Sequence, residues 1–104
     1  MTLLSGLLIV LPMQAVGIAW FRSAEDYKAL VALFDDRDSF RLTFEEWLLK
    51  AEEARKNIAG QGHAVVRAYL DPIEFPIWCA DRSLKIDSKS RMRFANEVAA
   101  GRWG

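Results

Sequence analysis

Residues 63–72 read HAVVRAYLDP, and this stretch decides the fold. Its valine and tyrosine residues are typical of strands, and a glycine turn at 60–62 precedes it. Asp71-Pro72 is typical of a helix start, because the carboxylate accepts from free amides and proline has no N–H to leave unbonded. We therefore predict a strand over 63–70 that leads directly into a helix.

A second strand-like stretch lies nearer the start of the chain, at residues 15–21, AVGIAWF. It shows no alternation of polar and apolar residues, which is typical of a strand buried on both faces. Helical patterns separate the two stretches, and strands joined through helices in one sheet run parallel with a right-handed crossover. We predict a small α/β domain with the order β-α-α-β-α-α and a short parallel sheet.

Four helices are predicted from capping signals and apolar spacing. Ser23 precedes a helix over 24–34, and Thr43 with Glu46 forms a capping box at the start of a longer helix that ends at the glycine turn of 60–62. The remaining two are expected over 73–82 and 89–100, and the first of them is expected to bury Ile73, Ile77, Trp78 and Cys79.

The composition excludes several classes of protein. With 104 residues, 52% of them hydrophobic, the chain is expected to fold as one domain with one core. The single cysteine, Cys79, excludes an internal disulfide. One cysteine and one histidine, His63, are too few to complete a zinc site from those residue types. We expect a reduced, cytoplasmic setting. We assign no catalytic residue, metal or cofactor, because Cys79 falls on an apolar helix face and no phosphate-binding glycine motif occurs.

The first charged residue is Arg22, so the chain begins with an uncharged apolar stretch. Pro12 interrupts this stretch and no basic residue precedes it, which disfavours both a membrane span and a secretory signal. We divide the chain into an N-terminal arm, residues 1–12, and a single α/β domain, residues 13–104. The segment 3–11 is an extra strand, an arm that packs on a neighbour, or upstream sequence.

A sheet of only two strands is marginal and leaves open edges. Either residues 3–11 extend it, or two chains join their sheets across a two-fold axis. We expect a homodimer because the apolar content is high for so small a body, and the same edge would also suit a different protein partner.

Polar residues gather where the two predicted strands end. Ligands of parallel sheets bind beyond the carboxyl ends of the strands, and an aromatic hollow with a few polar groups suits a small molecule. The alternative is that these residues are helix caps, core rings and solvated charges. The candidate ligand-binding residues are Trp20, Arg22, Tyr69, Asp71 and Glu74.

The fourteen basic and fourteen acidic residues cancel, but they are not evenly spread. Residues 25–53 hold nine acids and four bases, whereas residues 82–104 hold six bases and two acids. The basic end suits nucleic-acid contact, with Phe94 and Trp103 available for stacking, although the zero net charge of the chain disfavours this function. The alternative is that the basic end docks on the acidic half. The candidate nucleic-acid residues are Lys85, Lys89, Arg91 and Arg93.

The chain resembles a group of short uncharacterised bacterial proteins of the kind carried on mobile, integron-type gene cassettes. The stretches that carry this resemblance are GIAWF, TFEEWLLKAE, GHAVVR, IWC and RFANE, and it covers about residues 13–100. The resemblance implies a bacterial cytoplasmic setting and a compact domain, and it brings no assigned activity.

Three functions remain at this point. The first is a non-enzymatic binding protein that forms a homodimer or holds a protein partner. The second is a ligand-binding or enzymatic pocket at the carboxyl ends of the strands. The third is nucleic-acid contact through the basic last helix.

Overall fold

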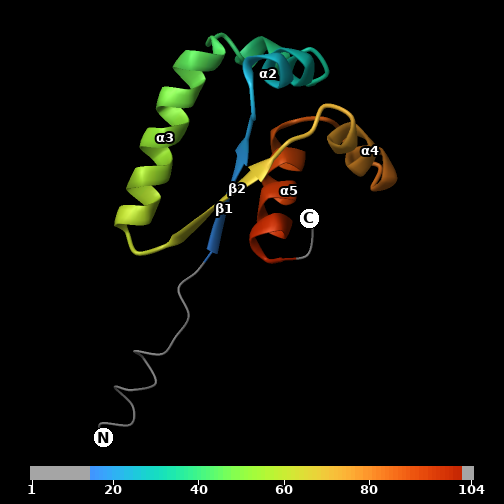
Figure 1. The fold of residues 1–104 in the computed structure, drawn as a ribbon. Coiled ribbons are helices and arrows are strands. Elements are labelled where there is room, and N and C mark those ends of the chain that lie inside the picture. The colour runs from blue at the N-terminus through green and yellow to red at the C-terminus, as the bar shows by residue number, and fades with distance from the viewer. Residues whose placement is uncertain (1–14, 102–104) are drawn as a thin grey trace, which may run out of the picture.

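The computed structural model describes residues 15–101, and the expected arm at 1–12 lies outside them. The elements follow the predicted order β-α-α-β-α-α, with one added 3₁₀ turn (Figure 1). They are β1 (Ala15–Trp20), α2 (Ala24–Val31), η1 (Arg37–Ser39), α3 (Phe44–Gly60), β2 (Ala64–Tyr69), α4 (Glu74–Asp81) and α5 (Ser88–Ala99).

The two strands form a parallel sheet, which confirms the predicted topology. Ala15 lies opposite Ala64 and Trp20 opposite Tyr69. Just beyond this register, the N–H of Leu70 donates to the carbonyl of Trp20 at 3.0 Å. The two strands are therefore paired with each other over their whole length, up to Leu70, the residue before Asp71.

Helices α3 and α5 lie on opposite sides of the sheet (Figure 1). Trp20 meets Trp47 of α3 with ring centroids 5.2 Å apart, whereas Gly17 backs onto Ala95 of α5. Because successive residues of a strand point to opposite faces, the β1 residues on the face of Trp20 point toward α3 and those on the face of Gly17 point toward α5.

Gly17 permits this close approach of α5. A Cβ atom at this position would lie 2.0 Å from the carbonyl oxygen of Ala95, a distance that real Cβ contacts do not reach. Helix α5 therefore packs directly on the backbone of β1, and only glycine fits at the contact.

The predicted starts of α2 and α3 are confirmed, whereas α4 begins at Glu74 with Ile73 in the N-cap position, two residues later than the predicted cap Asp71. The Ser23 hydroxyl accepts from Asp26 N–H at 3.1 Å, and Thr43 and Glu46 form both halves of the capping box. Helix α2, however, ends at Val31 rather than at 34, because Leu33 and Phe34 continue as single turns. Phe34 still reaches the core, which is why its spacing resembles a continued helix.

The prediction for the inner face of α4 was half wrong. Trp78 and Cys79 are buried as expected, but Ile73 and Ile77 are 73% and 55% exposed, and Phe75 takes the inner position instead. Phe75, Trp78 and Cys79 share one helical stripe, and the two larger rings bury more apolar area there than two isoleucines do. Phe75 and Trp78 form an aromatic cluster with Phe94 of α5.

Among the described helices, none is both long and apolar enough to cross a membrane.

Candidate functional site

The carboxyl ends of β1 and β2 open into a hollow of about 260 Å³. Four of the five residues predicted at the strand ends line it: Arg22 and Asp71 come from the loops after the two strands, Tyr69 ends β2, and Glu74 begins α4. The full lining is Arg22, Arg67, Tyr69, Asp71, Glu74, Phe75, Phe94 and Val98. We call this the strand-end hollow.

Trp20, the fifth predicted residue, does not line the strand-end hollow. Its ring is buried on the α3 side of the sheet, against Trp47 and beneath the guanidinium of Arg67, which lies 4.8 Å from the ring centroid. Trp20 therefore supports the sheet from behind rather than facing a ligand.

Arg22 is the exposed cation of the hollow. Its guanidinium carbon lies 4.6 Å from the centroid of the Tyr69 ring, a cation–π contact that restricts where the side chain points. Within residues 15–101, no carboxylate lies within ion-pair distance of Arg22. The guanidinium is thus oriented by the tyrosine ring and keeps its hydrogen-bond donors available.

Asp71 fixes the start of α4 at the edge of the hollow. Its Oδ2 accepts from the N–H groups of Ile73 and Glu74 at 2.9 and 2.8 Å. These backbone hydrogen bonds, first from Glu74 and then from Ile73, lower the pKa of Asp71, and the nearby charge of Arg22 lowers it further. Asp71 is therefore a charged, rigidly held acceptor.

Four lining residues were not predicted: Arg67, Phe75, Phe94 and Val98. Phe75 lies four residues after the predicted cap, Asp71, so its place beside the site is readable from the sequence once the inner face of α4 is known. Phe94 and Val98 come from α5, and no local signal shows which part of that helix reaches the strand ends.

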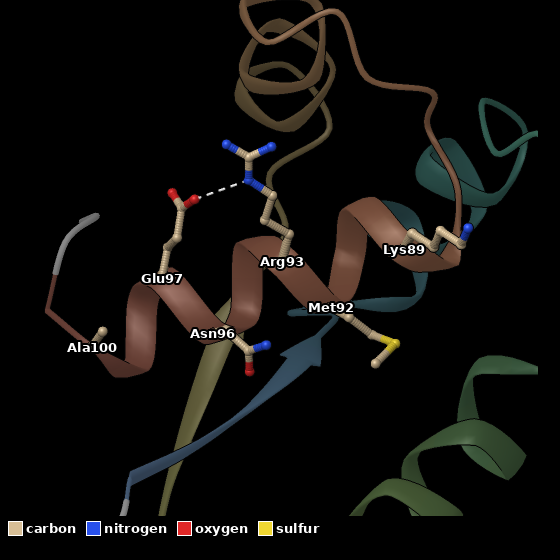
Figure 2. Close-up of a pocket in the computed structure, with 6 residues that line it drawn as sticks. All are labelled: Lys89, Met92, Arg93, Asn96, Glu97 and Ala100. Carbon is tan, nitrogen blue, oxygen red and sulfur yellow. Dashed lines mark hydrogen bonds and ion pairs between the residues drawn. The ribbon is translucent and has the colours of Figure 1, made fainter.

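The basic candidates of the C-terminal half have different surroundings. Lys85 and Lys89 are exposed, whereas Arg91 forms a bidentate pair with Asp36 and only 12% of its side chain is exposed. Arg93 pairs with Glu97 at 3.1 Å. Figure 2 shows this pair on one side of α5, with Met92 and Asn96 on the other.

The aromatic residues expected to assist nucleic-acid binding are not on that surface. Phe94 is buried in the cluster with Phe75 and Trp78, and Trp103 lies outside the described residues. Arg91 docks instead on Asp36, in the acidic half of the same chain. No observation here favours a nucleic-acid interface.

A second concave surface runs along the outer edge of β1. This β1-edge groove, of about 290 Å³, is lined by four consecutive strand residues and by residues of the two covering helices. Its lining is Val16, Gly17, Ile18, Ala19, Ile58, Ser88, Arg91, Met92 and Ala95.

Cys79 is a core residue. Burial raises the pKa of its thiol, while the Ser90 hydroxyl acts in the opposite direction. A neutral, buried thiol is a poor nucleophile. Among residues 15–101, no group of three histidine, cysteine or acidic side chains is placed to hold a metal ion.

Comparison with known proteins identifies a family rather than an activity. A family model described as a domain of unknown function (DUF8829) matches residues 11–103. No curated protein and no solved structure matches the chain.

Proposed function

This chain belongs to the domain of unknown function family DUF8829, and we propose that it is a non-enzymatic interaction protein that forms a homodimer through the outer edge of β1. The observation that carries the proposal is the β1-edge groove, where four consecutive strand residues are accessible beside an exposed methionine.

The outer edge of β1 has hydrogen-bonding groups without a strand partner in the described structure. Trp20 accepts from Leu70, and backbone groups of alternate residues point to opposite sides of a strand. Val16, Ile18 and Trp20 therefore face β2, whereas the N–H and C=O groups of Gly17 and Ala19 face outward. Within residues 15–101 the sheet has only these two strands, so nothing described there pairs with the outward groups.

The sequence of β1 suits a second copy as the partner. A two-fold interface requires one surface to complement itself, and residues 15–19 read AVGIA. Antiparallel pairing about Gly17 would place Ala15 opposite Ala19, and Val16 opposite Ile18. Each pair joins side chains of similar size, and none of the paired residues carries a charge.

The walls of the groove add apolar contact area. Met92 of α5 is 63% exposed, and its thioether is an adaptable apolar group that suits a protein interface. Ile58 of α3 lines the groove with it. Joining two sheets would also produce four strands, enough for a sheet with an apolar face to be stable.

We also propose that the protein works in the reduced bacterial cytoplasm and that its gene travels on integron-type cassettes. Its single cysteine, which is buried, suits a reducing compartment, and the stretches GIAWF and TFEEWLLKAE support the bacterial origin.

Light scattering across a concentration series tests the dimer. We expect a mass of two chains that falls toward one chain on dilution, and Met92→Glu should shift this transition to higher concentration. Leu49→Glu is the matched control, because Leu49 is 75% exposed on α3 and does not line the groove. A mass of one chain throughout would disprove the dimer.

Hydrogen exchange locates the interface independently of any variant. The amides of Gly17 and Ala19 should exchange more slowly as the protein concentration rises, because they become paired only in the dimer. If the dimer forms and these two amides still exchange at the same rate, another face carries it and the β1 assignment is wrong.

A further inference from the structure

We infer that the strand-end hollow binds a zwitterionic ligand, an α-amino acid with an apolar side chain. This inference is independent of the dimer, because the β1-edge groove shares no residue with the hollow.

Two opposite charges on the rim of the hollow have no ion-pair partner among residues 15–101. Arg22 and Glu74 both line it and both are exposed. Within the described part of the chain, neither forms an ion pair, and they do not pair with each other. A ligand that carries both charges complements this rim, whereas a simple anion or cation would meet a group of its own sign.

Arg22 supplies the carboxylate end of the site. A guanidinium matches a carboxylate with two parallel hydrogen bonds, and the contact with the Tyr69 ring already restricts the orientation of Arg22. Less side-chain freedom is therefore lost when the ligand binds.

The start of α4 supplies the ammonium end. Glu74 is exposed, its side chain accepts no hydrogen bond from residues 15–101, and the charged Asp71 lies three residues before it. Both backbone hydrogen bonds to Asp71 end on Oδ2, and Oδ1 takes part in neither of them. Two carboxylates at this point favour a cation and exclude a second anion.

The floor of the hollow is apolar. Phe75 and Phe94 are 1% and 5% exposed and lie with ring centroids 5.5 Å apart, and Val98 completes this surface. Ligand pockets for drug-sized molecules measure roughly 300–1,000 Å³, so a hollow of about 260 Å³ suits a smaller molecule. A single amino acid with an aliphatic side chain has the required size and polarity.

The outer edge of β2 offers backbone groups to the same ligand. Because Leu70 donates to β1, the N–H and C=O groups of Arg67 and Tyr69 point outward, by the alternation along a strand. Both residues line the hollow. Their backbone groups are in place to bond the carboxylate and ammonium groups, as happens when a ligand binds at a strand edge.

An NMR titration of the full chain tests this site with L-leucine as the probe. We expect saturable shifts at the amides of Arg67 and Tyr69. N-acetyl-L-leucine lacks the positive charge and L-leucinamide lacks the negative charge, and each should bind at least roughly tenfold more weakly, about 1.4 kcal/mol.

Two variants assign the two charges. Arg22→Gln should remove the preference for leucine over leucinamide, and Glu74→Gln should remove the preference for leucine over N-acetyl-leucine. Arg41→Gln and Glu53→Gln are the matched controls, since both residues are exposed and neither lines the hollow. Circular dichroism should show all four variants folded.

The contrary results are equally definite. The site is disproved if millimolar leucine leaves both amides unmoved in the wild-type chain. The zwitterion assignment is disproved if leucine, its amide and its acetyl derivative bind alike, because the apolar floor would then be the whole of the site. Neither result bears on the dimer, which light scattering measures separately.

Discussion

Arg91 donates hydrogen bonds to both carboxylate oxygens of Asp36, with Nη1–Oδ1 at 3.0 Å and Nη2–Oδ2 at 2.6 Å. The same guanidinium lies 4.3 Å from the centroid of Phe34 and 4.9 Å from that of Phe40. This pair joins α5 to the turn between α2 and α3. It is one direct contact between the basic end of the chain and its acidic half.

Arg91→Ala should lower the free energy of unfolding by roughly 2–3 kcal/mol, because it removes two charge-assisted hydrogen bonds and the ring contacts at a largely buried site. Arg93→Ala is the control, since half of that side chain is exposed and its pair with Glu97 is within one helix. Exposed pairs of this kind contribute about 0.3–0.5 kcal/mol. Urea unfolding measures both variants. Equal losses would contradict the structural role of Arg91.

The stability of the protein should fall as the pH is lowered through the acid range. The hydrogen bonds from Arg91 lower the pKa of Asp36, so the folded state holds this proton less tightly than the unfolded state. The stabilisation is complete above the unfolded pKa, about 3.9, and is lost as the pH falls through the lower folded value.

Asp36→Asn isolates this contribution. Asp71 and Glu52 also have lowered pKa values, so some acid sensitivity should remain in the variant. The urea midpoint of the wild type should therefore decline more steeply with acid than that of the variant. Parallel pH profiles would show that Asp36 has no part in the effect.

Gly17→Ala should be strongly destabilising, by roughly 2–3 kcal/mol, because the new methyl group would overlap the Ala95 carbonyl and move α5 off the sheet. Gly60→Ala is a matched control in the last turn of α3, where an added Cβ meets nothing within 4 Å. Alanine there should be neutral or stabilising by up to about 1 kcal/mol. Thermal unfolding compares the two, and a neutral Gly17→Ala would show that α5 sits farther from β1.

Cys79 should resist alkylation in the native protein. Its side chain is 1% exposed and burial raises the pKa of the thiol, so both access and thiolate concentration are low. Iodoacetamide should react at the rate at which the core opens and should react fast in urea. Rapid labelling of the native chain would place the thiol at the surface.

The strands, their order and the helix starts could be predicted because each depends on local chemistry. Ser23, Thr43 and Asp71 bond to amides two or three residues away, so their effect is visible in a short stretch. The inner face of α4 could not be predicted in full. Ile73 and Ile77 form one apolar stripe and Phe75 with Cys79 another, and only the neighbouring Phe94 decides between them.

The strand-end hollow was predicted in outline for a similar reason. Parallel strands bring their carboxyl ends together whatever the rest of the sequence, which is enough to gather Arg22, Tyr69 and Asp71. The floor depends on where α5 crosses the sheet. That position follows from the close contact at Gly17, and glycine in a strand does not show which helix will approach it.

The parallel register also determines how the chain folds. In each pair of the register, one residue precedes α2, η1 and α3 in the sequence and the other follows them. No tight turn can therefore bring the strands together early. A long loop must close before the first sheet bond forms, and such non-local pairing slows folding. Until then the apolar strand AVGIAW is exposed, so the yield of refolding should fall as the protein concentration rises.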